Sequence, residues 1–511
     1  MRTFAVYSSR MAYSTPSVAV IGAGFGGLGM AVALKRAGID SFVIFEKGDD
    51  VGGIWRENTY PGCGCDVPSH LYSFSFEKYR NSTVRFPAQA DILGYLRDVA
   101  EKYGLRRHLR TGTPIVAALY DDDTATWTLQ TAAGEQHRFD VVISAVGQLH
   151  NPKLPEIPGR AEYAGQSFHT ATWDAAAELD GKEVTVIGTG SSAAQLLPTV
   201  AGRARRVTVY QRTPNWVIPK PSRQFSTATS RALSHAPVLH DVLRAATYLA
   251  ADTVLSPVIS RGWSARPVTA LARWHLRRQV RDRDLRARLT PDYPAGCKRI
   301  VIDNGFYPAL QRDNVELVTD PIARITRDGV ETVAGQHRRA DVIVYATGFR
   351  TTEFLVPMDV VGSGGRKLQR EWADGAEAYL GMAVPGFPNL FLVHGPNTIL
   401  GHNSNVFMIE CQVRYIMNCL RMLPGTLEVN DEAMRTYSEW LRRTVGRTVW
   451  PAGCLSWYKT ESGRVTNPWP ASTFQYWRRT RRDPAPAFTV RLPAGRAAVP
   501  PDTGLITDRV R

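Results

Sequence analysis

Residues 17–27 read Ser-Val-Ala-Val-Ile-Gly-Ala-Gly-Phe-Gly-Gly, a short β-branched run that leads into a glycine-rich turn. The helical pattern Leu28–Ala37 follows, Gly38 ends it, and Ser41–Phe45 is typical of a second strand. These elements predict a βαβ unit of about thirty residues that closes on Glu46. Because the strand, the helix and the terminal acid are all present, the glycines indicate a dinucleotide-binding unit.

Three glycines and one acid predict how this unit binds its ligand. Gly22 permits the tight turn, Gly24 lets the backbone approach a pyrophosphate, and Gly27 lets the helix pack closely on the strand. The helix N-terminus then presents unpaired N–H groups to the phosphates. Glu46 is placed to accept hydrogen bonds from ribose hydroxyls, which favours the unphosphorylated ribose of FAD or NAD.

A second unit repeats the arrangement. Glu183–Ile187 predicts a strand, residues 188–193 form a loop of sequence Gly-Thr-Gly-Ser-Ser-Ala, and Arg206–Tyr210 predicts the next strand. Arg212 follows Gly188 by 24 residues, the spacing that separates Glu46 from Gly22. A cation at this place pairs with a 2′-phosphate, so we expect FAD in the first unit and NADPH in the second. The alternative is that Arg212 is a surface arginine after an edge strand.

Each unit closes on a similar buried strand, in Phe139–Gly147 and in Ala340–Gly348. We therefore predict an α/β protein with two Rossmann-like dinucleotide-binding domains and a helical insert in the second. The predicted bounds are residues 1–155 and 358–511 for the FAD-binding domain, 156–217 and 293–357 for the NADPH-binding domain, and 218–292 for the insert. Residues 1–16 and about 483–511 are expected to be disordered, and Met11 is an alternative start to Met1.

The chain of 511 residues carries 62 Lys and Arg against 47 Asp and Glu, a net charge of +15. Much of the excess lies between Gly202 and Arg299. Such a segment is compatible with nucleic acid, a membrane surface or an anionic cofactor. We favour the simpler interpretation, a solvated face on an Arg-rich helical insert, because no nucleic-acid module accompanies it.

The six cysteines form neither a disulfide framework nor a metal-ligand spacing. We interpret them as free thiols in a reducing compartment and predict no metal site. The most apolar segment, Val242–Ser260, contains Arg244 and Asp252, which favours a helix outside the membrane. The first sixteen residues lack the apolar run of a signal peptide. These features predict a cytoplasmic protein without a membrane span.

Residues 163–174, between the two glycine loops, read Tyr-Ala-Gly-Gln-Ser-Phe-His-Thr-Ala-Thr-Trp-Asp. This stretch resembles the fingerprint of the type I Baeyer–Villiger monooxygenases, which are class B flavin-dependent monooxygenases, with Tyr163 where Phe is usual. The resemblance extends over Val18–Trp469. It implies an enzyme that uses FAD and NADPH to insert one oxygen atom of O2 into a ketone through a C4a-peroxyflavin, giving an ester or a lactone.

The resemblance also implies two catalytic residues. Arg299 is expected to stabilise the anionic oxygen that attacks the carbonyl, and Asp66 to orient Arg299. His169 is expected to fix the linker between the domains. The alternatives are that Asp66 is a turn residue before Pro68 and that Arg299 belongs to the general basic excess.

The glycine loops and the resemblance together predict the residues that contact the cofactors. The expected FAD set is Gly22, Gly24, Gly27, Glu46, Gly53, Ile54, Trp55, Tyr72 and Asn405. The expected NADPH set is Gly188, Thr189, Gly190, Ser191, Ser192, Gln195, Arg212, Thr213, Lys298 and Trp457.

Three other functions remain open at this point. The nearest is an N- or S-oxygenating flavin monooxygenase that acts through a C4a-hydroperoxyflavin. A disulfide reductase with two dinucleotide domains needs a redox cysteine pair, for which Cys63 and Cys65 are badly spaced. The third is a non-catalytic nucleotide-binding or membrane-surface protein. The expected partners are a ketone and O2, without nucleic acid, in a monomer or weak homo-oligomer, and the identity of the ketone stays open.

Overall fold

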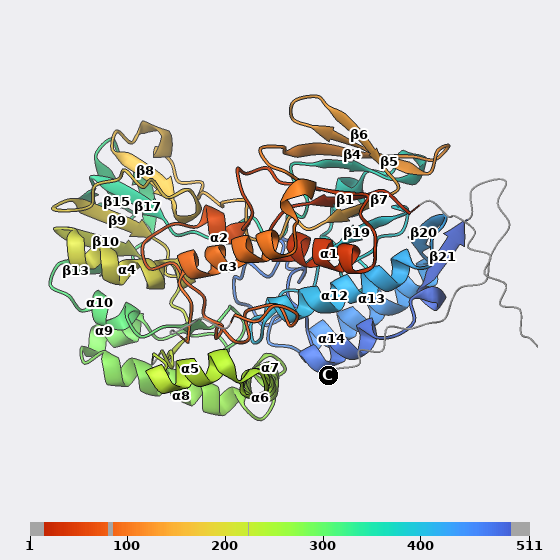
Figure 1. Cartoon of the computed structure of the whole chain (residues 1–511). Helices are drawn as coiled ribbons and strands as arrows, with labels where there is room; N and C mark the ends of the chain where they lie inside the picture. The colour runs from red at the N-terminus through yellow and green to blue at the C-terminus, as the bar shows by residue number, and fades with distance from the viewer. Residues whose placement is uncertain (1–14, 80–84, 223, 492–511) are drawn as a thin grey trace, which may run out of the picture.

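The computed structural model describes residues 15–79, 85–222 and 224–491, and two parallel five-stranded sheets organise it (Figure 1). The first has the order β19-β7-β1-β2-β3 and the second the order β13-β10-β9-β17-β8. Each sheet is built around a βαβ unit that begins at one glycine loop. The prediction of an α/β fold with two Rossmann-like units is therefore confirmed.

The first unit comprises β1 (Val18–Ile21), α1 (Phe25–Arg36) and β2 (Phe42–Phe45). β1 pairs in parallel with β2 and, on its other side, with β7 (Val141–Ser144). β3 (Leu109–Arg110) and β19 (Leu390–Leu392) complete the sheet. All four residues of β1 and of β7 are buried, as expected for a parallel sheet covered on both faces.

The second unit comprises β9 (Glu183–Ile187), α4 (Ser191–Arg203) and β10 (Arg206–Tyr210), with both strands ending at the predicted residues. β17 (Val342–Tyr345) and β13 (Val315–Val318) flank these strands. β8 (Gln166–His169) pairs with β17 at the edge of the sheet, so the fingerprint stretch forms part of this domain.

The two glycine loops approach the end of a neighbouring strand in the same way. Gly22 has φ +103°, and a Cβ on it would lie 2.6 Å from the carbonyl oxygen of Ala145, just after β7. Gly188 has φ +111°, and a Cβ on it would lie 2.5 Å from the carbonyl oxygen of Ala346, just after β17. Glycine is required at both positions by conformation and by space. This equivalence supports the predicted internal duplication.

A separate four-stranded sheet, which the sequence analysis did not predict, covers one side of the first domain. It has the order β18-β4-β5-β6. Its strands are β4 (Ile115–Asp121), β5 (Thr126–Thr131), β6 (Gln136–Phe139) and β18 (Asp359–Val361). Trp127 on β5 is fully buried, and its indole N–H donates to the carbonyl of Pro388 at 2.8 Å. The tryptophan thereby anchors this sheet to the segment before β19.

The helices of residues 227–288 form a layer along the lower edge of Figure 1. They are α5 (Thr227–His235), α6 (Pro237–Ala250), the π-helix η4 (Ala251–Leu255), α7 (Ser256–Ile259), α8 (Ala265–Gln279) and α9 (Arg283–Arg288). β11 (Val217–Ile218) enters this layer and β12 (Val301–Ile302) leaves it, and the two strands pair in parallel. The chain thus returns beside the point where it departed.

The remaining helices and strands complete the two domains. The shorter helices of the two domains are α2 (Ile54–Glu57), α3 (Gln89–Lys102), α10 (Phe306–Leu310) and α11 (Leu368–Glu371). A separate three-stranded sheet consists of β14 (Ile322–Ile325), β15 (Gly329–Thr332) and β16 (His337–Arg339). α12 (Asn405–Leu420), which packs on α1, precedes α13 (Asp431–Gly446) and α14 (Thr473–Thr480). Short 3-10 turns are η1 (Arg106–His108), η2 (Arg160–Glu162), η3 (Thr170–Thr172), η5 (Ser363–Gly365) and η6 (Ala485–Ala487).

The predicted disorder from about residue 483 is wrong for residues 483–491. β21 (Phe488–Arg491) pairs antiparallel with β20 (Thr426–Val429), and Phe488 is buried against Tyr379 and Phe391. One apolar side chain therefore orders a segment whose composition is otherwise typical of a tail. The other parts of the predicted disorder, residues 1–14 and 492–511, lie outside the described residues.

The interpretation of all six cysteines as free thiols is also wrong. Cys297 and Cys454 form a disulfide with their Cα atoms 6.3 Å apart, although 157 residues separate them in the sequence. Cys63, Cys65, Cys411 and Cys419 are free. Folding brings the two bonded cysteines together, so their spacing along the chain gave no sign of the pair. The argument from free thiols to a reducing compartment therefore loses its basis.

One helical run, Val238–Ile259, is long and apolar enough to cross a membrane by length and composition. It spans 22 residues of α6, η4 and α7, and only 11% of its apolar window is buried inside the protein. The run is therefore not a core helix. Its charged residues, Asp241, Arg244 and Asp252, all bind other parts of the chain.

Substitution of Gly27 tests the packing of the first unit. A Cβ on Gly27 would lie 1.8 Å from the carbonyl oxygen of Gly22, so Gly27→Ala must push α1 off β1. We expect a loss of about 1–3 kcal/mol of stability, seen as a lower Tm together with reduced flavin content. The matched control is Gly94→Ala in α3. A Cβ on Gly94 would meet no described atom of another segment within 4 Å, so alanine should stabilise the helix by up to about 1 kcal/mol. A Gly27→Ala protein with unchanged Tm and full flavin content would contradict this account.

Candidate active site

Asp66 and Arg299 meet although 233 residues separate them. The Nη2 group of Arg299 donates to both carboxylate oxygens of Asp66, at 2.8 and 2.7 Å, and Nε lies 3.3 Å from Oδ2. Asp66 follows the turn of residues 62–65 in the first domain, and Arg299 stands two residues before β12. The structure thus brings together the two residues that the sequence analysis assigned to catalysis.

The ion pair is well shielded, with the side chain of Asp66 16% exposed and that of Arg299 23% exposed. Burial acts to raise the pKa of Asp66, but the adjacent Arg299 guanidinium outweighs it and holds the pKa below its usual value. The carboxylate in turn raises the pKa of Arg299 against the effect of burial. Both groups are therefore charged at neutral pH.

Lys220, which the sequence analysis did not single out, adds a second cation to this site. Its ammonium group donates to the carbonyl oxygen of Cys65 at 3.3 Å, and its charge further lowers the pKa of Asp66. Two cations thus face one carboxylate. The site keeps an excess positive charge that is available to an anion.

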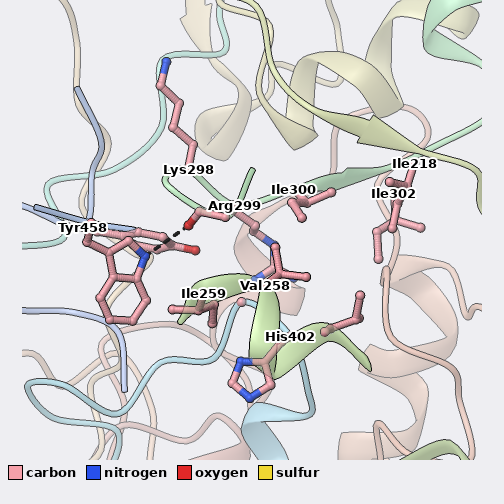
Figure 2. A pocket seen from close by; sticks show the side chains of 13 residues that line it. Ile218, Val258, Ile259, Lys298, Arg299, Ile300, Ile302, His402 and Tyr458 are labelled. Atoms are coloured by element: carbon pink, nitrogen blue, oxygen red, sulfur yellow. Dashed lines mark hydrogen bonds between the residues drawn. The ribbon is translucent and has the colours of Figure 1, made fainter. Parts of the chain in front are cut away.

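A cavity adjoins Arg299. Apolar side chains dominate its walls, and Figure 2 shows three isoleucines together on one side, across from Tyr458. The lining residues are Ile218, Leu255, Val258, Ile259, Gly296, Lys298, Arg299, Ile300, Ile302, Gly401, His402, Trp450 and Tyr458. Most of these apolar residues come from the helical insert and its two flanking strands. Sequence reasoning missed them because isoleucine and valine in a short strand are equally typical of a core.

Tyr458 forms the wall nearest to the ion pair. Its side chain is buried, and burial raises its pKa to about 12, although the nearby Arg299 opposes the shift. The neighbouring Trp457 packs against it with ring centroids 4.4 Å apart, and Thr351 donates to the Trp457 carbonyl at 2.7 Å. The loop that contains the predicted cofactor residue Trp457 is thereby held beside the cavity.

Lys298 directs its side chain away from the apolar wall formed by the isoleucines (Figure 2). Its ammonium group donates to the hydroxyl of Thr213 and lies 4.7 Å from the ring centroid of Tyr293. Burial, together with the charge of Arg212, lowers the pKa of Lys298 to about 8. Lys298, Arg212 and Thr213 therefore form one basic cluster at the carboxyl end of β10.

Arg212 is exposed and forms no hydrogen bond or ion pair with any described residue. The turn that contains it is fixed from behind, because Asn215 donates to the carbonyl of Thr189 at 2.7 Å. Above that loop, a Cβ on Gly190 would meet no described atom within 4 Å. Open space beside a glycine loop and an unpaired arginine fits a bound nucleotide phosphate.

The first glycine loop offers a similar site. A Cβ on Gly24 would meet only the backbone of Gly53, at 3.7 Å, while Gly27 and Gly22 are in close contact. Glu46 is buried, and its carboxylate accepts the backbone N–H groups of Ala23 and Gly48, both at 2.8 Å. These bonds hold the acid at the carboxyl end of β2 and leave it further lone pairs for a ribose.

Aromatic residues lie next to this loop. The indole N–H of Trp55 donates to the hydroxyl of Tyr72 at 3.2 Å, and Tyr72 packs edge-on against Phe25 with centroids 5.1 Å apart. Ile54 begins α2 beside Trp55. Asn405 begins α12, and its side-chain oxygen accepts the N–H of Leu400 at 2.7 Å. The structure thus places Ile54, Trp55 and Tyr72 beside this loop.

Gln195, which was predicted to bind NADPH, lies between the two domains. Its amide donates to the carbonyl of Gly64 at 2.9 Å and accepts the hydroxyl of Tyr60 at 2.8 Å. A Cβ on Gly62 would lie 2.2 Å from the Gln195 carbonyl, so the two domains touch closely at this point. Ser191 and Ser192 precede Gln195 in the first turn of α4, with Thr189 buried below them.

The residues of the fingerprint stretch make contacts that stabilise the fold. The Nδ1 atom of His169 accepts the N–H of Ala171 at 3.0 Å, and its buried ring packs against Phe349. Tyr163 donates its hydroxyl to the Ala340 carbonyl at 2.9 Å, so the tyrosine that replaces phenylalanine gains a hydrogen bond. Trp173 packs edge-on against Phe168 at 4.9 Å. The stretch secures the edge strand β8 and the linker after it.

Cys63 and Cys65 are poorly suited to disulfide chemistry. Burial raises the pKa of the Cys63 thiol to about 11, and burial raises that of Cys65 above its usual range as well. The thiolate is the reactive form, so neither residue is activated at neutral pH. This observation argues against the disulfide-reductase alternative.

The family described as pyridine nucleotide-disulphide oxidoreductase matches residues 19–245 of the chain. A Baeyer–Villiger monooxygenase of Streptomyces coelicolor is 40% identical over 507 residues, which is 96% of this chain and 96% of that protein. A Baeyer–Villiger monooxygenase of Pseudomonas aeruginosa is 39% identical over 477 residues, 92% of this chain and 90% of that protein.

Among solved structures, OTEMO in complex with FAD and NADP superposes with a TM-score of 0.84 at 26% identity. The match covers 93% of this chain and 99% of that one. With this site and these relatives, the chain belongs to the family of Baeyer–Villiger monooxygenases.

Proposed function

We propose that this protein inserts one oxygen atom of O2 into an apolar ketone, with FAD and NADPH as cofactors, to give an ester or a lactone. The observation that carries the proposal is the shielded Asp66–Arg299 pair at the wall of an apolar cavity. Bound FAD would pass electrons from NADPH to O2. The residues of the chain supply binding, charge and exclusion of water.

The two cofactors fit the residues present. The open space above Gly24 and the fixed carboxylate of Glu46 suit the pyrophosphate and ribose of FAD. The unpaired Arg212, with Lys298 and Thr213 beside it, suits the 2′-phosphate of NADPH. We assign these residues to cofactor binding on that basis.

Arg299 is the residue that we assign to the reaction itself. Negative charge on oxygen must be stabilised while a carbonyl is attacked, and a guanidinium keeps its proton under working conditions. Asp66 acts through Arg299, because the carboxylate accepts hydrogen bonds from both Nη2 and Nε and so fixes the plane of the guanidinium. The apolar walls exclude water, which strengthens this electrostatic contribution.

The adjacent residues Lys298 and Arg299 have different roles, Lys298 in NADPH binding and Arg299 in the reaction. Figure 2 shows Lys298 turned away from the apolar wall, while Arg299 lies beside it. Lys298 also lines the cavity but donates its ammonium group to Thr213, and the remaining walls are mostly apolar, which favours a hydrocarbon ketone. We further propose a cytoplasmic location, a monomer or weak homo-oligomer, and no nucleic-acid partner.

A substrate panel distinguishes ketone oxidation from N- or S-oxygenation. Purified enzyme is incubated with NADPH, ¹⁸O2 and cyclic, linear and aryl ketones, with amines and thioethers in parallel. We expect one ¹⁸O atom in an ester or lactone, with NADPH consumption matched to product. Exclusive formation of N- or S-oxides would overturn the proposal.

Removal of Arg299 tests the assigned role. We expect Arg299→Ala to keep flavin reduction by NADPH largely intact but to lower ester formed per NADPH by about 100-fold or more, because the charge that stabilises the anionic oxygen is lost. The measurement is product and hydrogen peroxide per NADPH consumed. Arg324→Ala, which removes an exposed arginine on β14, is the control. Near wild-type ester yield in Arg299→Ala would mean that the role is misassigned.

The pH dependence of NADPH binding tests Lys298. Its pKa of about 8 lies below the ordinary lysine value, so the side chain loses its proton as the pH rises through 8. We expect the KM for NADPH to rise above pH 8 in the wild type. In Lys298→Arg this dependence should disappear because arginine stays charged, whereas Lys298→Met should have a high KM at every pH. A wild-type KM that is flat from pH 7 to about 9 would contradict the phosphate contact.

A further inference from the structure

The helix formed by α6, η4 and α7 presents apolar side chains outward and polar side chains toward the rest of the protein. Its outward face presents Val238, Val242 and Leu249, which are 74%, 58% and 57% exposed. These positions recur at helical spacing, and the exposed residues between them include alanines at 245, 246 and 250. Of the fifteen large hydrophobic side chains exposed in the described residues, eight lie between 238 and 274. A contiguous apolar face of this kind marks an interaction surface.

The inward face of the same helix is polar and firmly held. Arg244 donates to the carbonyls of His70 and Ser73, both at 3.0 Å. Asp252 accepts the backbone N–H of Thr473 at 2.8 Å and its hydroxyl at 2.6 Å. These contacts lie on the side of the FAD-binding domain. The apolar face therefore points outward in the folded protein because the polar face is already satisfied.

The same contacts show that the helix lies on a surface and does not cross a bilayer. To span, it would have to leave the protein and place the charged Asp241, Arg244 and Asp252 in or near hydrocarbon, besides losing their partners. An amphipathic helix that stays seated on its domain can instead bury its apolar face in the interface between headgroups and acyl chains.

The charge around the helix indicates the kind of surface. Residues 218–292 contain thirteen basic residues and five acidic ones, a net charge of +8. Arg261, just after α7, and Arg266, at the start of α8, are exposed and form no ion pair with any described residue. Trp263 between them is 68% exposed, and Trp274 on α8 is exposed with Arg278 over its ring. Exposed tryptophan beside arginine is the composition of a lipid interface.

We propose that the outward face of α6, η4 and α7, with Trp263 and its flanking arginines, docks on an anionic lipid bilayer. Apolar area supplies one part of the binding and attraction to anionic headgroups supplies the other. The occupant is lipid because the patch combines exposed aliphatic and tryptophan side chains with unpaired positive charge.

Docking would place the lipid surface close to the substrate cavity, an inference that rests on the proposed function. Leu255, Val258 and Ile259, at the end of the same helix, line the cavity beside Arg299. The outward face would then contact lipid while the inward end forms the wall of the substrate cavity. An apolar ketone dissolved in the bilayer would lie within one helix thickness of its binding site.

The test measures binding of the purified full-length flavoprotein to vesicles, which requires no turnover. Co-sedimentation is compared for vesicles of phosphatidylcholine alone and of phosphatidylcholine mixed with phosphatidylglycerol, at low and high salt. We expect binding to the anionic vesicles that weakens as salt increases. Absence of binding to either composition at low salt would overturn the proposal, whatever the substrate panel shows.

Two sets of variants locate the contact. Val242→Ser with Leu249→Ser removes apolar area without altering charge and should weaken partition by about tenfold or more. Arg261→Gln with Arg266→Gln should weaken binding to anionic vesicles by about fivefold per arginine. The matched control is Val333→Ser, at a 68% exposed position in the turn between β15 and β16, which should bind as the wild type does. Flavin content and Tm establish that each variant is folded.

Other outcomes identify another occupant. If the serine pair binds vesicles as tightly as the wild type, the helix is not the contact and the proposal fails. If light scattering shows that the wild type dimerises without lipid and that the serine pair is monomeric, the face is an interface between two copies of this chain. That result would also overturn docking on a bilayer.

Discussion

The ion pair between Asp66 and Arg299 constrains the whole structure. A guanidinium beside an apolar cavity needs a carboxylate to offset its desolvation, and the carboxylate comes from a different domain. The pair forms only if the domains keep a fixed relation. Contacts of Gln195 with Tyr60 and Gly64, and the close approach of Gly62 to α4, hold that relation. The disulfide between Cys297 and Cys454 then joins the Arg299 segment to the loop that contains Tyr458.

The helical insert connects the site to the surface. β11 and β12 pair where the chain enters and leaves the insert, so Ile218 and Ile302 contribute to the cavity from adjacent strands. The α7 end of the long helix closes the same cavity. Its polar contacts with Ser73 and Thr473 leave the apolar side facing outward. One helix thus serves as a wall for the substrate and as an exposed apolar surface.

Sequence reasoning predicted those parts of the fold that depend on local signals. The two βαβ units were found because strand, glycine loop and helix follow one another, and β9 and β10 end at the predicted residues. Asp66 and Arg299 were identified through a family resemblance and not through spacing. The β4–β6 sheet, the Cys297–Cys454 bond, Lys220 and the isoleucines of the cavity were missed. Each depends on contacts between distant segments, which no local pattern encodes.

The central claim is that Asp66 acts through Arg299, and a double-mutant cycle tests it directly. Ester formed per NADPH consumed is measured for Asp66→Ala, Arg299→Ala and the double variant, with the rate of flavin reduction as a reference. The account predicts that Asp66→Ala forms much less ester per NADPH consumed than the wild type, and that the double variant forms no less than Arg299→Ala alone. Additive losses in the double variant, or a wild-type ester yield per NADPH in Asp66→Ala, would contradict the account.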